Sequence, residues 1–333
     1  MSKIVILPLL IISQLNLKND LWHFGPEITY NVTYNANTAL NQSNNNWKNS
    51  KLNYEMKTQL KCRPRTLKIL NCHIEKPVVS FDHANKSISS ENICGEDIDR
   101  QNFEIRFNRF GIKELIVSSN IKPYILDTIR AIVNQLNAGV DLTVRTNGTY
   151  RTWENFTTGD CFTFYDVKLS GDNLEKKKND GEGFKWRSDV STLITKIRDV
   201  KKCRINAPYF LGSREAWRDT PQVLINIKSS KTVMSANRTA FISTTKTSIE
   251  LENLHKKSPT SIIYMNETMT LKYISVKPSN NQITRIQEPA CTSVITGKWL
   301  HDDLSVENDV NEQKKYNITS KSSLASLMFN FDN

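Results

Sequence analysis

The sequence predicts a mainly β protein in which one amphipathic α-helix packs inside or against the sheet. Three observations predict this class: apolar and polar residues alternate with period two through most of the chain, one segment breaks that pattern with helical spacing, and six cysteines follow an N-terminal export signal. With 333 residues and 38% hydrophobic content, the chain is long enough for one large β domain or two ordinary ones.

Period-two alternation marks the expected strands. The apolar residues of the first strand share one face: Ile28, Tyr30, Val32 and Tyr34. Where residues 63–65 separate two such runs, we expect a hairpin with a proline-containing turn. Gly111 suits a tight turn between two later strands. The other strands are expected at residues 52–56, 60–62, 67–74, 103–107, 113–117, 141–144, 161–167, 223–227, 240–242 and 271–276.

One segment has the spacing of an amphipathic helix. Pro123 suits its first turn, where a missing N–H costs little, and Gly139 lies just beyond its end. Leaving its apolar stripe in water would forgo about 10 kcal/mol of burial, so the helix must be covered. The stripe consists of Ile125, Leu126, Ile129, Ile132, Val133 and Leu136.

The two ends of the chain differ from the middle. Residues 1–16 contain a charged start, the apolar run 4–12 and a polar exit, which is typical of a secretory signal peptide. That run is far shorter than the ~20 residues of a membrane-spanning helix, so we expect a secreted, extracellular chain with no transmembrane segment. Residues 171–183 are rich in Gly, Asp and Lys and predict a solvated loop. Residues 301–333 are polar and are interpreted as a linker.

Net charge and sequons indicate the binding partners and the glycosylation of the exported chain. A net charge of +11 favours an acidic partner, namely a receptor, an anionic lipid surface or a glycan, whereas export argues against nucleic acid as the main partner. An evenly basic, soluble surface is the alternative. Asn-x-Ser/Thr sequons, which are candidate glycosylation sites, stand at Asn31, Asn41, Asn85, Asn147, Asn155, Asn237, Asn266 and Asn317.

No motif indicates catalysis, a metal or a cofactor. The sequence lacks Gly-x-Ser-x-Gly, His-Glu-x-x-His, a P-loop and Gly-x-Gly-x-x-Gly, and its five histidines are scattered singly. We therefore expect no enzyme activity and no zinc site. In an exported chain, disulfides are the default interpretation of Cys62, Cys72, Cys94, Cys161, Cys203 and Cys291.

Three stretches together carry a family resemblance. One runs from Phe103 to Leu115 and leads into the helix of residues 125–136; another is the entry from Trp22 through Gly25 to Tyr30. The last begins at residues 158–161, continues with Tyr165, and runs to Cys203. Taken together, they resemble the N-terminal domain of vitellogenin and its large lipid transfer relatives, over residues 20–300.

The resemblance implies a strongly curved, antiparallel, β-barrel-like sheet of about ten strands enclosing one central helix. It also implies a disulfide between Cys161 and Cys203. The expected hairpin makes Cys62–Cys72 plausible, which leaves Cys94 and Cys291 as a third pair. Relatives continue into a helical domain and two further sheets, so residues 301–333 would lead toward a helical domain. Lipid would be cargo only together with those parts, and no other cofactor is expected.

A basic run lies beside the second cysteine of the implied pair: Lys196, Arg198, Lys201, Lys202 and Arg204. It resembles the segment that yolk precursors present to endocytic receptors of the lipoprotein-receptor class, whose acidic, calcium-holding modules clasp lysines. Lys196 and Arg198 would share one strand face, with Lys201 nearby. An ordinary solvated face is the other interpretation of such a run.

The resemblance thus implies a secreted lipid-transport or yolk-precursor protein, which is a nutrient reservoir, with an N-terminal receptor-recognition domain. One alternative is a stand-alone extracellular recognition protein that binds anionic cell or microbial surfaces through its basic face. Another is a chaperone-like partner domain of a lipid transfer protein.

Overall fold

The computed structural model describes residues 23–41, 51–66, 68–83, 86–90, 101–142, 147–170, 191–206, 223–237, 239–253 and 262–295. The expected signal peptide, the polar loop, the C-terminal linker and Cys94 lie outside these residues. In the described part, no helix is long and apolar enough to span a bilayer.

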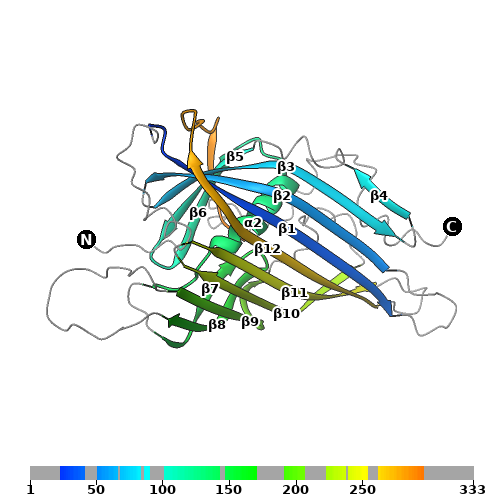
Figure 1. Ribbon diagram of the computed structural model, residues 1–333. Coiled ribbons are helices and arrows are strands. Elements are labelled where there is room, and N and C mark those ends of the chain that lie inside the picture. Colours follow the sequence, from blue (N-terminus) through cyan, green and yellow to red (C-terminus); the bar gives the residue numbers. More distant parts are fainter. Residues whose placement is uncertain are drawn as a thin grey trace.

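In the part of the chain that the structure describes, thirteen antiparallel strands form one sheet around one α-helix (Figure 1). Along the sheet the order is β13-β6-β5-β3-β2-β1-β12-β11-β10-β9-β8-β7, and β4 pairs with β3 outside this path. The strands are β1 (Pro26–Asn41), β2 (Lys51–Thr66), β3 (Ile69–His83), β4 (Lys86–Ser90), β5 (Asn102–Asn108), β6 (Gly111–Ser118), β7 (Gly148–Phe156), β8 (Gly159–Ser170), β9 (Ser191–Asn206), β10 (Val223–Ala236), β11 (Phe241–Asn253), β12 (Ile262–Pro278) and β13 (Pro289–Thr292).

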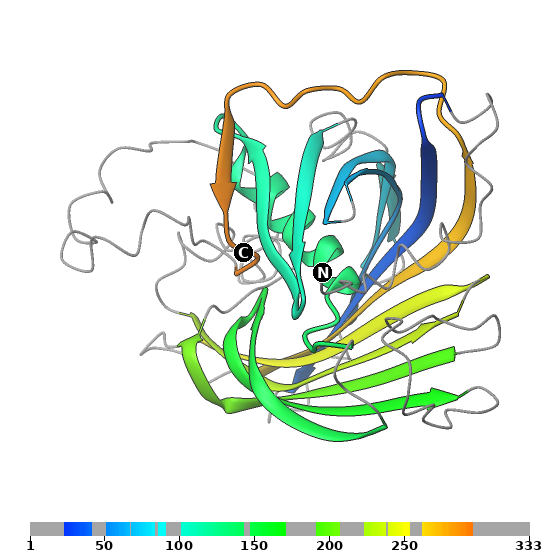
Figure 2. The same ribbon diagram turned by 90° about the vertical axis from the view of Figure 1, so that its left-hand side faces the viewer.

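The predicted fold class is confirmed: the sheet is strongly curved and wraps around the helix (Figure 2). It is not closed, because β7 and β13 are its two edges and do not pair with each other. The described part contains more strands than the about ten that the resemblance implied. Those missed include the short edge strand β13 and the strand β7, which has no aliphatic residue.

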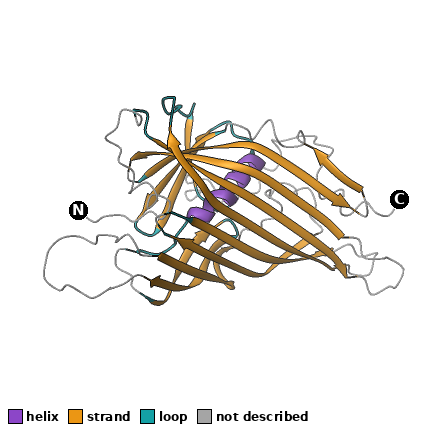
Figure 3. Cartoon of the chain, viewed as in Figure 1, coloured by secondary structure: helices purple, strands orange, loops and turns teal. Residues whose placement is uncertain are grey.

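The helix fills the concave side of the sheet (purple in Figure 3). Helix α2 (Pro123–Val133) continues into the 3-10 turn η4 (Asn134–Leu136), and all six residues of the predicted stripe are buried. Pro123 begins the helix, as expected. Gly139 follows it with φ +77°, a left-handed conformation that favours glycine.

Buried polar contacts fix the helix to edge strand β13 and the residue after it. The Arg130 guanidinium donates to Ser293 O at 2.9 Å and to Thr292 Oγ1 at 2.6 Å, and it pairs with Asp127 Oδ1 at 2.9 Å. Because a buried guanidinium is costly without such partners, this set of contacts specifies where α2 meets the edge strand.

Two local predictions are wrong. Pro64 is not in a turn: β2 runs to Thr66 and pairs Pro64 with Leu70, beside an irregularity of the ladder where a missing N–H is tolerated. The strand expected at 141–144 does not include Asp141 or Leu142, and residues 143–146 lie outside the described part. The next strand begins at Gly148 instead.

Within the described residues, two disulfides join neighbouring strands. Cys62 on β2 bonds to Cys72 on β3, and Cys161 on β8 bonds to Cys203 on β9. Cys291 is half-buried and forms no disulfide within the described residues. Its pairing with Cys94 therefore stays a prediction.

We expect Ile129→Ala to lower the free energy of unfolding by about 2–5 kcal/mol, because it removes a fully buried side chain from the helix that fills the sheet. Val78→Ala, on β3 with 42% exposure, is the matched control and is expected to cost less than about 1 kcal/mol. Urea unfolding followed by circular dichroism measures both. Similar losses for the two variants would contradict a central packing role for α2.

Candidate functional site: the basic strand beside the second disulfide

The basic run lies on β9, and strand alternation divides it. Along residues 192–198, side chains alternate between buried and solvent-facing positions. Lys196 and Arg198 therefore point to the inside of the sheet, with exposed fractions of 0% and 3%. The expectation that these two cations face a partner is corrected by this orientation, although they do share one face.

Lys196 is bound inside the protein by a carboxylate and a backbone carbonyl. Its ammonium lies 2.5 Å from Glu154 Oε1 on β7 and donates to Asn137 O at 2.7 Å in the segment after η4. The Asn137 side chain donates to the same Glu154 oxygen at 3.3 Å and accepts from Ile112 N at 3.0 Å. One carboxylate thus joins β7, β9 and the segment that follows the helix.

Arg198 occupies the other side of this carboxylate. Its guanidinium forms an ion pair with Glu154 Oε2 at 3.2 Å without hydrogen-bond geometry. It donates to Ser230 Oγ at 3.2 Å and Thr232 Oγ1 at 3.1 Å on β10, and it stacks 3.5 Å above the Phe156 ring. The ring face is attractive to a desolvated cation, which matters because the cluster carries two cations and one anion.

Burial and charge shift the pKa values of this cluster. Desolvation alone would raise the pKa of Glu154, but Lys196 and Arg198 outweigh it and hold that pKa below its usual value. Desolvation lowers the pKa of Lys196 to about 8, against the opposing effect of the Glu154 charge. Burial first, and then the Glu154 charge, raise the pKa of Tyr165 well above its usual value. The carboxylate therefore stays ionised, and the tyrosine stays neutral, near neutral pH.

Glycine makes room for this cluster. A Cβ atom on Gly139 would lie 2.4 Å from the Tyr165 hydroxyl and 2.7 Å from Glu154 Oε1, distances that real Cβ atoms do not show. The positive φ of the same residue makes a side chain there strained as well. The chain can pass this close to the buried charges only at a glycine.

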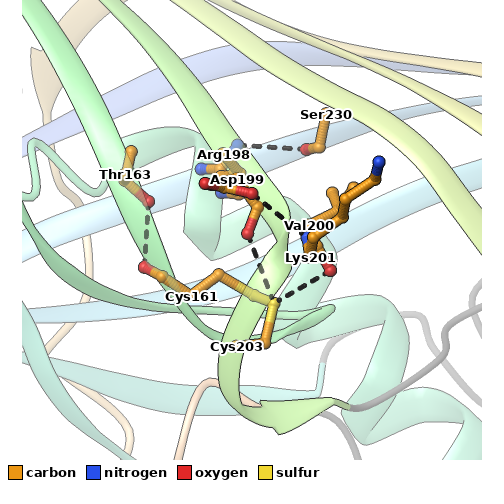
Figure 4. The surroundings of a disulfide bond; sticks show 8 residues. All are labelled: Cys161, Thr163, Arg198, Asp199, Val200, Lys201, Cys203 and Ser230. Atoms are coloured by element: carbon orange, nitrogen blue, oxygen red, sulfur yellow. Dashed lines mark hydrogen bonds between the residues drawn. A yellow bond between two sulfur atoms is a disulfide. The ribbon is translucent and has the colours of Figure 1, made fainter.

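The rest of the basic run is exposed on a bulge. Cys161 is opposite Cys203 and Thr163 is opposite Arg198, so one residue of β8 faces four of β9, residues 199–202. In Figure 4 this segment lies against the Cys161–Cys203 disulfide, with Cys203 Sγ 3.6 Å from Val200 O, while Arg198 reaches Ser230. Bulge and disulfide together hold Lys201 and Lys202 in solvent at the rim of the sheet.

Among the described residues, the ion pairs of the exposed cations are long. Lys202 lies 4.0 Å from Asp199, and Arg204 lies 3.9 Å from Asp160. The Arg204 guanidinium also stacks 4.0 Å above the ring of Trp153. Exposed pairs of this length contribute little to stability, so these side chains are available to an acidic partner.

Several sequons lie on the surface of the sheet. The side chains of Asn31, Asn147, Asn155 and Asn266 are exposed, and Asn237 is half-buried in the β10–β11 turn, where its Oδ1 accepts from Ala240 N at 2.7 Å. The side chains of Asn41, Asn85 and Asn317 lie outside the described part.

Sequence reasoning missed the inward partners of β9, namely Glu154, Asn137, Phe156 and Tyr165. The available signal was the alternation of Tyr150, Thr152, Glu154 and Phe156, which places a lone carboxylate on the same face as two aromatic residues. A single acid on that face is a sign that a buried cation is needed opposite it.

The described part is thus a mainly β protein: one curved sheet around one helix, with a charged cluster inside. A model of the vitellogenin N-terminal domain family matches residues 22–281, and the chain belongs to this family. The family is a lipid-transport family of secreted proteins.

A solved structure of lipovitellin, titled for its lipid–protein interactions, has the same fold. The TM-score is 0.54 at 10% sequence identity, over 85% of this chain and 28% of the lipovitellin chain. The present chain therefore spans less than a third of that protein. None of the curated proteins matches the chain.

We expect Glu154→Gln to lower the free energy of unfolding by about 3–5 kcal/mol, because it leaves Lys196 and Arg198 buried without a counter-ion. Glu55→Gln is the matched control: its partner, Lys57, is 63% exposed, so a loss below about 1 kcal/mol is expected. Urea unfolding at neutral pH compares the two. Equal losses would mean that the buried carboxylate has no special role.

The same carboxylate makes stability pH-dependent. Its folded pKa lies below the usual value of 4.5, so the unfolded chain takes up the proton first as the pH falls. The contribution of Glu154 is therefore complete above 4.5 and is lost as the pH falls from there through the folded pKa. Urea midpoints measured from about pH 7 to about pH 3 should decline more steeply for the wild type than for Glu154→Gln. Parallel curves would contradict the assignment.

Proposed function

We propose that this chain is the N-terminal part of a secreted lipid-transport or yolk-precursor protein, and that an endocytic receptor of the lipoprotein-receptor class recognises it. Family membership supports the first statement. The observation that carries the second is the bulge of residues 199–202, which is held by the Cys161–Cys203 disulfide and presents lysines to solvent.

The chemistry fits an acidic receptor module. Lys201 and Lys202 are adjacent and exposed, and Arg204 lies two residues beyond Lys202. A module that holds calcium through carboxylates offers the complementary charge, and an ordered backbone lowers the entropy lost when a lysine is clasped. Lys196 and Arg198 contribute indirectly, because their buried contacts fix the strand that carries the bulge.

Lipid enters as cargo of a longer protein. The chain spans 28% of the lipovitellin chain it matches, so lipid carriage by this chain alone is not part of the proposal. N-glycans on the exposed sequons Asn31, Asn147, Asn155 and Asn266 are proposed as modifications that accompany secretion.

We expect the triple variant Lys201→Ala, Lys202→Ala, Arg204→Ala to bind an immobilised calcium-loaded acidic receptor module at least about tenfold more weakly than the wild type, and with a smaller salt dependence. Surface plasmon resonance at two ionic strengths measures both effects. The side chains are exposed, so the urea midpoint should stay near the wild-type value.

A matched control replaces exposed lysines elsewhere, Lys57→Ala and Lys113→Ala on β2 and β6. Wild-type affinity is expected for that control. If the triple variant also bound like the wild type, the bulge would have no role in receptor recognition.

A further inference from the structure

The outer face of the layer β7–β12 carries an apolar stripe, which we define as Trp153, Phe164, Ile197, Val233, Ile242 and Ile274, one residue from each strand. Five of these six are among the large hydrophobic side chains that the described part exposes, with Ile197 at 50% and Ile274 at 45%. Single exposed apolar residues are ordinary, but a continuous series across six strands calls for a physical reason.

Strand register makes the stripe continuous from Trp153 to Ile242, and Ile274 lies two residues beyond Lys272, the partner of Ile242. Phe164 is directly opposite Ile197, and Phe162, whose ring centroid lies 5.6 Å from that of Trp153, joins Trp153 to Phe164. Ile197 is opposite Lys231, which places Val233 at the diagonal position. The pairing of Ser235 with Ile242 repeats this step. Diagonal neighbours across a sheet are within reach of each other, and six strands span about 24 Å.

The inner face of β10 and β11 is polar in its middle, although the same strands also bury Met234, Ala236, Phe241, Ile249 and Leu251. The buried positions of β10 and β11 include Ser230, Thr232, Ser243, Thr245 and Thr247. The hydroxyls of Thr232 and Thr245 are 2.8 Å apart, and Ser243 and Thr245 donate to Gln135 Oε1 at 3.1 and 3.0 Å. Polarity is thus partly reversed relative to an ordinary half-buried sheet, with aliphatic residues facing out.

Cations without carboxylate partners flank the stripe. Arg151 is opposite Phe164 and stacks 4.8 Å above it, Lys231 is opposite Ile197, and Lys272 is opposite Ile242. Lys246 is opposite Lys231. Within the described part, none of these four cations forms an ion pair.

Each described carboxylate on this face has one cation near it that balances its charge. Asp160, Asp166, Asp199 and Glu250 each lie within 4.0 Å of a cation, namely Arg204, Lys168, Lys202 and Lys228. Among the described side chains, these four carboxylates are balanced one for one, and Arg151, Lys231, Lys246 and Lys272 remain in excess, so the field around the stripe is positive.

We propose that this face binds an anionic phospholipid surface, with the stripe entering the headgroup region and Arg151, Lys231, Lys246 and Lys272 contacting headgroup phosphates and carboxylates. Charge complementarity selects this occupant: the cations are spread along the whole stripe and match a continuous anionic plane. Interfacial binding generally combines buried apolar area with attraction between cations and anionic lipid in this way. The proposal is independent of receptor recognition by the bulge.

The sequons on this layer lie beside the stripe. Asn155 is two residues beyond Trp153 on β7. Asn266 on β12 pairs with Ser248, two residues along β11 from Lys246. Glycans there would border the contact without replacing any member of the stripe. The test therefore compares the secreted protein before and after enzymatic removal of N-glycans.

Flotation with vesicles measures the binding. The wild type is expected to float with phosphatidylcholine vesicles that contain about 30% phosphatidylserine and not with phosphatidylcholine alone, and to be released by salt. The variant Lys231→Gln, Lys246→Gln, Lys272→Gln should bind on the order of a hundredfold more weakly at low ionic strength. Ile197→Thr, Val233→Thr, Ile242→Thr keeps β-branched residues and should bind at least about tenfold more weakly.

Matched controls are Lys57→Gln with Lys113→Gln, and Val78→Thr, all exposed and outside β7–β12; wild-type partition is expected for them. Unchanged urea midpoints show that each variant is folded. The proposal is overturned if the wild type does not float, or if the triple lysine variant and the triple aliphatic variant both float like the wild type. It is also overturned if only the glycan-free form binds. A further contradicting result would be a wild-type dimer in sedimentation that becomes a monomer in the triple aliphatic variant, because a second copy would then cover the face.

Discussion

The Glu154 carboxylate links the edge strand β7, beyond its ladder with β8, to the rest of the molecule. It lies on β7, the last strand of the sheet order, and reaches Lys196 on β9 and the Asn137 side chain after the helix. An edge strand has ladder hydrogen bonds on one side only, so β7 gains from contacts of its inner face. A buried ion pair adds little net stability over an apolar pair, but breaking it is costly, so the cluster fixes geometry more than it adds stability.

Because of this cluster, the inward side chains of β9 serve packing, and its outward side chains serve contacts with partners. Because Lys196 and Arg198 serve the core, only the outward side chains and the bulge remain for partners. The residues of the bulge precede Cys203, and the disulfide holds the segment where the ladder is interrupted. The strand thus presents lysines at the rim and an isoleucine, Ile197, on its outer face, and these two surfaces differ in charge and in the partner they suit.

The sequence predicted those features in which one pattern has one interpretation. Apolar spacing from Ile125 to Leu136 fits only a helix. Its burial follows because exposing such a wide apolar stripe to water is costly. It could not predict the orientation of β9, because Ile194 and Ile197 are apolar on opposite faces and either face could be the inner one. Strand β7 was missed because Trp153 faces out and Glu154 faces in, which weakens its alternation, and the partner that explains Glu154 lies 42 positions away.

The polarity of the layer β9–β11 connects the buried cluster with the outer surface. Thr232 lies inside, where it accepts from Arg198 and contacts Thr245, so this part of the inner face must hold hydroxyl groups for the buried guanidinium and for Gln135. Val233 and Ile242 then lie outside, since successive side chains of a strand alternate between faces. A polar interior here does not require an apolar exterior, because threonine or lysine satisfies the outward positions of a strand equally well. The inner face therefore does not explain the aliphatic residues on the outer face, and the cations beside them fit the anionic surface proposed for it.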